Sequence, residues 1–301
     1  MLNLRFWFRS AGSVAAIFIV ILTKGAVLGQ ESSGVSGLQR VSENQRFHQQ
    51  ATQRMGLLIP LYIYPADIHT NADYNRVMEL KRQYNEVPFW VIVNPASGPG
   101  SEVDANYTKA IDRLIGSGCV VLGYVPTNYG KIPEKHVRRD LDAWQRLYPR
   151  VHGIFYDEMI YEDTAAAVDH QKQLNAMAHG MGYWPTVGNP GTSTPGRYFA
   201  NEAVDVIVVH EADRWPTEAQ LHGDYFGGYS DFPPSTRATL MYSQEKCDPE
   251  DIKMARRYAR WIYVTQDTYK LNDPEHPNPW DNLSVHLEAM CRILVNKEAG
   301  S

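Results

Sequence analysis

Short apolar runs alternate with longer amphipathic stretches along the chain from residue 56 onward. Each run has the length of a buried strand, and most are rich in the β-branched and aromatic residues that favour strands. Strands separated by helical stretches are typical of parallel sheets with helical crossovers. Eight such runs are expected to be strands, at residues 56–64, 88–94, 119–125, 151–158, 183–189, 204–211, 238–242 and 261–265.

The stretches between these runs carry apolar residues three or four positions apart, which is the helical period. The regular alternation with eight strands predicts a single-domain α/β fold, a (β/α)8 TIM-type barrel. A doubly wound open sheet is the alternative, although it more often stops at five to seven strands, and no dinucleotide-binding motif is present. The clearest expected helices cover residues 73–86, 104–116, 133–147, 164–180 and 283–296.

The N-terminal region has a different pattern. A start that contains two arginines is followed by an apolar run over residues 11–22 and then by small residues up to Gly29. This order is typical of a secretory signal peptide, predicted here over residues 1–29. The run is shorter than the roughly 20 residues of a membrane span, so an uncleaved anchor is only the alternative. Residues 30–54 are expected to form a polar linker or lead-in and residues 55–301 the barrel, in a secreted or periplasmic protein.

Composition narrows the classes of partner. The chain has 301 residues and a formal net charge of -5, with few basic clusters, which argues against binding nucleic acid. It contains 18 tyrosines and 7 tryptophans, whose apolar faces and polar edges suit sugar rings when they are not simply core residues. We expect a monomer with a polysaccharide substrate, and contact with a membrane only through an uncleaved anchor.

Three cysteines occur, at Cys119, Cys247 and Cys291. Their spacing matches no zinc-binding pattern. A Cys247–Cys291 disulfide is one interpretation, and three unpaired thiols that behave as small apolar residues are the other.

The predicted strands end in side chains that can carry chemistry. In a barrel of this kind, the carboxyl ends of the strands converge on one site. The run over 151–158 ends in Asp157 and Glu158, and the run over 204–211 ends in Glu211. No Schiff-base lysine, nucleophile elbow or phosphate-binding glycine loop stands at these ends. The sequence therefore indicates carboxylate chemistry.

Two carboxylates on either side of a glycosidic bond can hydrolyse it. Strand alternation points Asp157 and Glu158 in different directions, so we expect one of them to act with Glu211. The amides and phenols at other strand ends are expected to contact sugar hydroxyls and ring faces; they are Tyr62, Asn94, Tyr124, Asn189 and Tyr242.

Two other interpretations of the acids are open. A strand-end acid can simply cap the next helix or pair with an arginine. The same three acids could also hold a hard cation such as Mg²⁺. Histidines near strand or helix ends lack the spacing of zinc ligands, at His136, His152 and His210. We therefore expect no cofactor and no metal.

Several short motifs occur together in a distinctive order. They are LIPLYIYP (58–65), VNPASGPG (93–100), GYV (123–125) followed by YG (129–130), GIFYDE (153–158) and NPWD (278–281). In this combination the chain resembles the spherulin 4 family, which is grouped with glycoside hydrolase family 135. The resemblance extends over residues 56–290.

The resemblance implies a (β/α)8 barrel and, for the characterised hydrolases, endo-cleavage of α-1,4-linked N-acetylgalactosamine in the exopolysaccharide galactosaminogalactan. It also implies that the functional acids are a pair ending strand four and a Glu ending strand six, which here are Asp157, Glu158 and Glu211. Glu211 would be the general acid, Asp157 the nucleophile, base or charge stabiliser, and Glu158 a substrate-orienting group; the first two roles are exchangeable. If the sugar is N-acetylated, its own amide could be the nucleophile. The alternative is a non-catalytic carbohydrate-binding or cell-surface protein.

Overall fold

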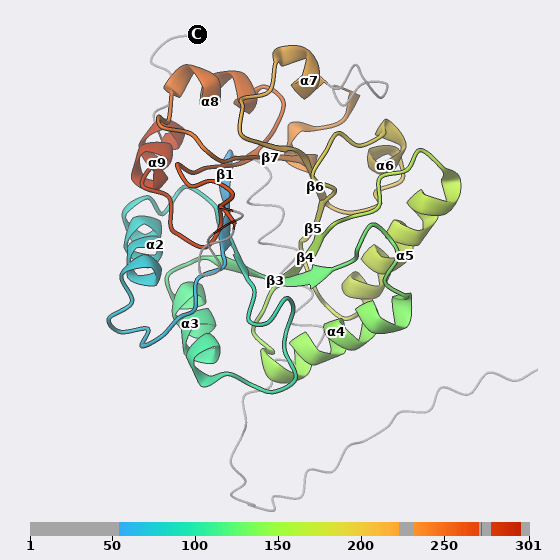
Figure 1. Cartoon of the computed structure of the whole chain (residues 1–301), viewed down its shortest axis with the longest axis horizontal. Helices are drawn as coiled ribbons and strands as arrows, with labels where there is room; N and C mark the ends of the chain where they lie inside the picture. The colour runs from blue at the N-terminus through green and yellow to red at the C-terminus, as the bar shows by residue number, and fades with distance from the viewer. Residues whose placement is uncertain (1–53, 223–230, 271, 273–277, 296–301) are drawn as a thin grey trace, which may run out of the picture. The chain divides into compact units, whose positions relative to one another are not determined.

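The computed structural model describes residues 54–222, 231–270, 272 and 278–295, which all fall in one compact unit. In this part of the chain, eight parallel strands close into a barrel in sequence order (Figure 1). The predicted (β/α)8 barrel is confirmed, and the open sheet is wrong because β1 and β8 pair. The strands are β1 (Gly56–Leu61), β2 (Phe89–Val93), β3 (Val120–Pro126), β4 (Gly153–Asp157), β5 (Thr186–Asn189), β6 (Val206–Ala212), β7 (Arg237–Met241) and β8 (Trp261–Val264).

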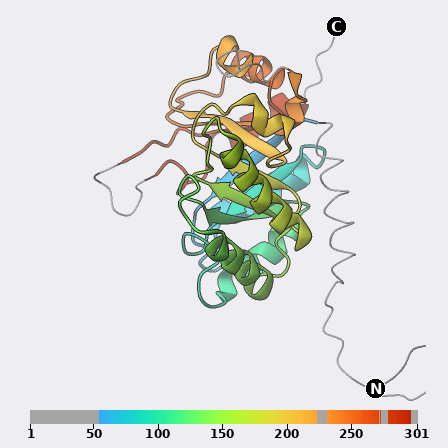
Figure 2. The ribbon, with the colours of Figure 1, turned by 90° about the vertical axis from the view of Figure 1, so that its right-hand side faces the viewer.

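Helices surround the barrel on the outside of the strands (Figures 1 and 2). Several begin at a side chain that accepts a hydrogen bond from a free helical N–H, as Asp104 does for α3 and Thr164 for α5. The helices are α2 (Ala72–Gln83), α3 (Ala105–Gly116), α4 (Glu134–Leu147), α5 (Ala165–Gly180), α6 (Gly196–Ala200), α7 (Glu218–His222), the 3-10 turn η3 (Pro234–Thr236), α8 (Pro249–Arg256) and α9 (Leu287–Val295).

Some element boundaries differ from those expected. β1 ends at Leu61, so Tyr62 follows the strand and lies at the rim of the barrel. β5 begins only at Thr186, after Pro185, which has no N–H to give to a ladder. α9 begins at Leu287 rather than at 283. The expected signal peptide and most of the expected linker lie outside the described residues.

The barrel interior is packed at its amino-terminal end and open at the other. Trp90 of β2 and Trp261 of β8 stack with ring centroids 3.4 Å apart and are fully buried. Gly123 allows α4 to approach β3 closely, because a Cβ there would lie 2.6 Å from the Trp144 ring. The Trp144 indole N–H then donates to the Tyr124 carbonyl over 3.0 Å, which fixes the end of β3.

The three cysteines are unpaired in the structure. Cys119 and Cys291 are buried, and Cys247 is half-buried. The Cys247–Cys291 disulfide therefore does not form, and the interpretation as unpaired thiols holds. No helix among the described residues is both long enough and apolar enough to cross a membrane.

Candidate active site

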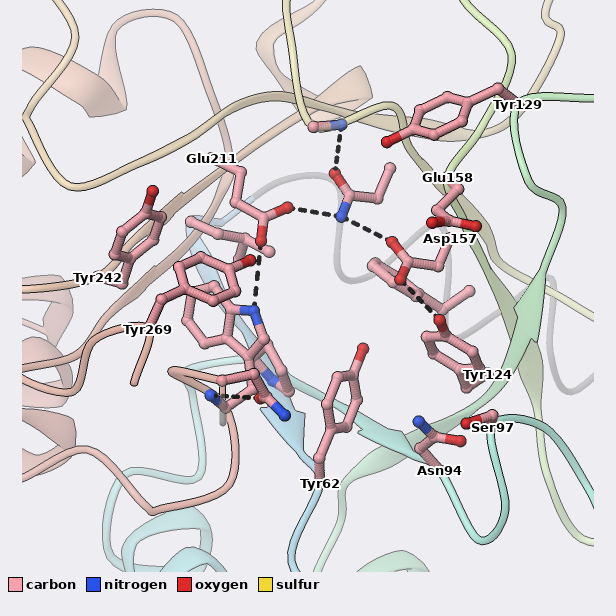
Figure 3. Close-up of a pocket in the computed structure, with 17 residues that line it drawn as sticks. Tyr62, Asn94, Ser97, Tyr124, Tyr129, Asp157, Glu158, Glu211, Tyr242 and Tyr269 are labelled. Carbon is pink, nitrogen blue, oxygen red and sulfur yellow. Dashed lines mark hydrogen bonds between the residues drawn. The ribbon is translucent and has the colours of Figure 1, made fainter. Parts of the chain in front are cut away.

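A cavity of about 530 Å³ opens at the carboxyl ends of the strands (Figure 3). Its wall includes all the site residues expected from the sequence, namely Tyr62, Asn94, Tyr124, Asp157, Glu158, Asn189, Glu211 and Tyr242. These side chains come from seven of the eight strands or their ends. Barrel closure therefore brings them together, although they are up to 180 positions apart in the sequence.

Asp157 is the last residue of β4 and accepts two side-chain hydrogen bonds. The Tyr124 hydroxyl donates to Oδ2 over 2.7 Å, and the Asn189 amide donates to Oδ1 over 2.9 Å. Burial raises the pKa of Asp157, while the bonds from Tyr124, the Glu158 N–H and Asn189 oppose that rise. Donors on both oxygens favour the ionised carboxylate.

Glu211 lies on the opposite side of Asn189 from Asp157. The Asn189 Nδ2 donates to its Oε2 over 2.6 Å, and the Trp280 indole N–H donates to its Oε1 over 3.3 Å. Burial and the charge of Asp157 raise the pKa of Glu211 from 4.5 to about 7. Glu211 can therefore hold a proton in mildly acidic solution.

Asn189 fixes the separation of the two acids. Its Nδ2 lies 2.9 Å from an Asp157 oxygen and 2.6 Å from a Glu211 oxygen, so these two oxygens are within 5.5 Å of each other. The other face of the amide is also held, because Asn189 Oδ1 accepts from the Gly191 N–H over 3.0 Å. Asn189 is thus a rigid spacer between the carboxylates.

Glu211 faces the cavity because β6 contains one extra residue relative to β7. Val208 pairs with Ala238, but His210 pairs with Thr239, so the register shifts at Val209. Glu211 then pairs with Leu240, which lines the cavity. Without the shift, strict alternation from Val208 would turn Glu211 outward.

Glu158 also lines the cavity, contrary to the expectation that alternation would turn it away from Asp157. The strand ends at Asp157, and Glu158 takes a φ of 52°, which re-aims its side chain. Its carbonyl accepts from the Thr127 hydroxyl over 2.8 Å and from the Tyr129 N–H over 2.6 Å. Figure 3 shows Glu158 beside Asp157, on the side of the cavity nearer Tyr129.

Aromatic rings form much of the remaining wall. Tyr62 and Tyr124 meet edge to face with centroids 5.7 Å apart, and Tyr242 meets Tyr269 in the same way at 5.1 Å. Sequence reasoning missed Tyr269 and Trp280 as site residues because both follow β8 in a long connection rather than ending a strand. The NPWD motif was the available signal for Trp280.

The three acids do not form a cation cage. In the part of the chain that the structure describes, no group of three or more His, Cys, Asp or Glu side chains is arranged to hold a metal ion. His210 instead bonds the Arg214 carbonyl over 2.8 Å, and the His152 ring accepts from the Val121 N–H over 3.1 Å. These two histidines have structural partners.

Comparison with known proteins gives consistent matches. The sequence pattern of Spherulin4, described as spherulation-specific family 4, matches residues 56–294. Spherulin-4 of Physarum polycephalum is 31% identical over 166 residues, which are 54% of this chain and 46% of that protein. The match thus spans about half the length of that relative. The crystal structure of Aspergillus clavatus Sph3 in complex with GalNAc is similar with a TM-score of 0.65 and 26% identity, over 81% of this chain and 98% of that one.

Proposed function

Because the chain belongs to the spherulation-specific family 4, as the resemblance of its motifs had indicated, we propose that it is a glycoside hydrolase. Its substrate would be an α-1,4-linked polymer of N-acetylgalactosamine and galactosamine, cut at internal bonds. The observation that carries the proposal is the pair Asp157 and Glu211, held within 5.5 Å by Asn189 in an open cavity. The GalNAc bound by Sph3 supports the class of sugar.

Glu211 is suited to be the general acid. With its pKa raised to about 7 by burial and by Asp157, it keeps a proton that it can give to the glycosidic oxygen. As the C–O bond breaks, the leaving sugar takes this proton and Glu211 becomes ionised. Glu211 can then take a proton from the water that completes hydrolysis.

Asp157 is suited to act at the anomeric carbon. Hydrogen bonds from Tyr124 and Asn189 keep it oriented and favour its ionised form. It can attack the anomeric carbon directly, or it can orient and polarise an acetamido group of the substrate that attacks instead. Both routes retain the anomeric configuration, and two carboxyl oxygens no more than 5.5 Å apart fit the short carboxyl separation of retaining enzymes. Glu158, beside Asp157, would orient the sugar.

Exposed tyrosines on both sides of the acids favour cleavage within a polymer. Tyr129 and Tyr161 form an edge-to-face pair at 6.1 Å, each 39% exposed. On the other side of the cavity, Tyr269 is 48% exposed beside Tyr242 (Figure 3). Sugar units that extend from the reacting bond in either direction can therefore meet an aromatic face.

The test is incubation of the purified protein with partially acetylated α-1,4-galactosamine polymer. We expect new reducing ends and a rapid fall in polymer size, which marks internal cleavage. Asp157→Asn and Glu211→Gln should each abolish most of this release while leaving the fold unchanged. Binding of the polymer by wild type without any release would favour the second candidate, a carbohydrate-binding protein on the same barrel.

We also propose that residues 1–29 export the protein and are removed, so that it acts outside the cytoplasm. The charged start, apolar run and small residues of this segment support the proposal. Sequencing the N-terminus of the protein recovered from the cell exterior tests it. An intact N-terminus in the membrane fraction would instead favour the uncleaved anchor.

A further inference from the structure

Trp280 is held against Glu211 from several directions. It lies between β8 and α9, is only 5% exposed, and donates its indole N–H to Glu211. Its ring packs edge to face on Tyr242 at 6.2 Å and against Tyr263 at 6.1 Å. Its carbonyl accepts from the Tyr62 N–H over 3.1 Å, which ties this connection to the end of β1. These contacts together fix the orientation of the indole ring.

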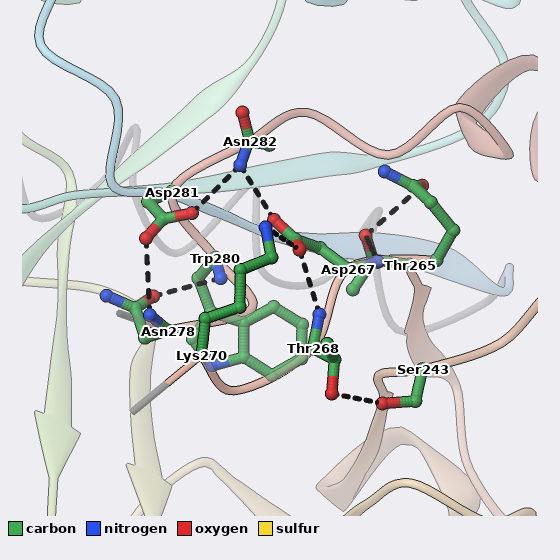
Figure 4. Close-up of polar contacts among 10 residues, drawn as sticks. Ser243, Thr265, Asp267, Thr268, Lys270, Asn278, Trp280, Asp281 and Asn282 are labelled. Carbon is green, nitrogen blue, oxygen red and sulfur yellow. Dashed lines mark hydrogen bonds and ion pairs between the residues drawn. The ribbon is translucent and has the colours of Figure 1, made fainter. Parts of the chain in front are cut away.

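A chain of polar side chains supports Trp280 from behind (Figure 4). Asn278 Oδ1 accepts from the backbone N–H of Trp280 over 2.9 Å, and Asp281 Oδ2 accepts from the backbone N–H of Asn278 over 3.2 Å. The Asn282 amide then donates to Asp281 Oδ1 over 3.0 Å and to Asp267 Oδ2 over 2.7 Å. We call Asp267, Asn278, Asp281 and Asn282 the Asp267 network.

Asp267 anchors this network at the end of β8. It is 6% exposed, pairs with Lys270 over 2.8 Å, and accepts from the Thr268 N–H over 2.9 Å. Burial alone would raise the pKa of Asp267, but the bonds from Lys270, Asn282 and Thr268 outweigh it and hold the pKa below its usual value. The anchor therefore stays ionised over the pH range in which Glu211 titrates.

We propose that Trp280 is a positioning residue for Glu211, and that the Asp267 network holds its indole N–H on the Glu211 carboxyl group. The proposal rests on the proposed role of Glu211 as general acid. It goes further because it assigns the orientation and proton affinity of that acid to the connection between β8 and α9.

Glu211 has negatively charged surroundings and few side-chain hydrogen-bond donors that stabilise its ionised form. The charged group that raises its pKa is Asp157 of β4. The titratable phenols around it come from strand ends and from the connections that follow β3 and β8, at Tyr62, Tyr124, Tyr129, Tyr242 and Tyr269. Its side-chain donors are Asn189 and Trp280. Loss of the indole N–H leaves the ionised form with one fewer donor, so the proton is held more tightly.

The test variant is Trp280→Phe, which removes the N–H but keeps an aromatic ring. The alkaline limb of the pH profile of kcat/KM reports the pKa of the general acid in the free enzyme. We expect this limb to move to higher pH by about 0.7 unit. The indole N–H stabilises the ionised carboxylate more than the neutral acid, because a hydrogen bond to a charged group is the stronger one, so its loss raises the pKa of Glu211. Asn282→Ala should move it in the same direction by less, and lower kcat more than it changes KM.

Trp261→Phe is the matched control. It also removes a buried indole N–H bond of 3.3 Å, donated to the Ser235 carbonyl, but at the opposite end of the barrel. We expect it to lower the free energy of unfolding without moving the alkaline limb. Thermal unfolding of all variants shows whether each one is folded.

A second readout is independent of turnover. The carboxyl carbon of Glu211, identified as the ¹³C signal that is missing in Glu211→Gln, can be titrated by NMR in wild type and Trp280→Phe. Suppose that wild type cleaves polymer. If neither the alkaline limb nor the NMR titration of Glu211 moves in Trp280→Phe, or if both move equally in Trp261→Phe, the proposal for Trp280 is wrong and the proposed function stands. If wild type cleaves nothing, the proposed function fails, and the NMR titration still decides whether Trp280 acts on Glu211.

Discussion

Replacing Glu211 by glutamine should change stability in opposite directions at the two ends of the pH range. The pKa of Glu211 lies at about 7 in the folded protein, against 4.5 for an ordinary glutamate, because the carboxyl group is buried beside Asp157. The folded state therefore binds a proton that the unfolded state releases, and stability falls as pH rises from 4.5 through 7. Glutamine has no proton to lose and escapes this penalty.

The size of the penalty follows from the two pKa values. It is about 3 kcal/mol at pH 8, about 1 kcal/mol at pH 5, and close to zero at pH 4. Against this, the glutamine side chain offers one acceptor oxygen in place of two, so the bond from Asn189 or that from Trp280 is lost at about 1 kcal/mol. Glu211→Gln should thus be about 2 kcal/mol more stable than wild type at pH 8 and about 1 kcal/mol less stable at pH 4.

Urea denaturation followed by tryptophan fluorescence at several pH values measures this difference. The crossing point is expected near pH 5. Glu102→Gln, at an exposed position, is the control and should differ from wild type by less than about 0.5 kcal/mol at every pH. A difference between Glu211→Gln and wild type that is constant from pH 4 to pH 8 would refute the raised pKa, and with it the assignment of Glu211 as the proton donor.

Three further changes test the site and the fold. Asp157→Asn removes the group proposed to act at the anomeric carbon, so activity should fall at least about 10²-fold. It also removes the charge that helps to raise the pKa of Glu211, so the alkaline limb of the pH profile of the remaining activity should move to lower pH. Tyr161→Ala should raise KM for long polymer about threefold to tenfold and leave short oligomers unaffected, as comparative kinetics on size-fractionated substrate will show. Gly153→Ala places a Cβ 2.0 Å from a backbone oxygen of the segment before β5 and should destabilise the protein by about 3 kcal/mol, whereas Gly116→Ala, with open space around it, should not; urea denaturation compares them.

The fold could be predicted because its signal repeats. A buried parallel strand appears as an apolar run, as in Phe89–Val93, and eight such runs with helical stretches between them leave few architectures. The ends of elements were less predictable. Tyr62 and Tyr64 continue the apolar pattern of β1, but the chain leaves the sheet at Leu61 to meet the carbonyl of Trp280. Such contacts join segments far apart in the sequence and leave no local pattern.

The site was predictable where chemistry stands at a strand end. Asp157, Asn189 and Tyr124 follow this rule. In β4, for example, side chains alternate between the two faces, so Asp157 points inward as Phe155 does. Trp280 and Tyr269 do not follow it, since they reach the cavity from the connection after β8. Their positions depend on tertiary contacts such as the Asp267 network.

The two remaining acids reach the cavity only because the chain departs from regular strand geometry. Glu158 does so through a positive φ, and Glu211 through the register shift at Val209. A regular β6 would have turned Glu211 away from the cavity and from Asp157, whereas in the cavity its ionisation costs about 3 kcal/mol at neutral pH. Irregular backbone and a destabilising carboxylate thus coincide at one residue. Such local conflicts are expected at functional sites rather than in a scaffold selected for stability alone, which favours the hydrolase over a barrel that keeps these acids only for hydrogen bonding.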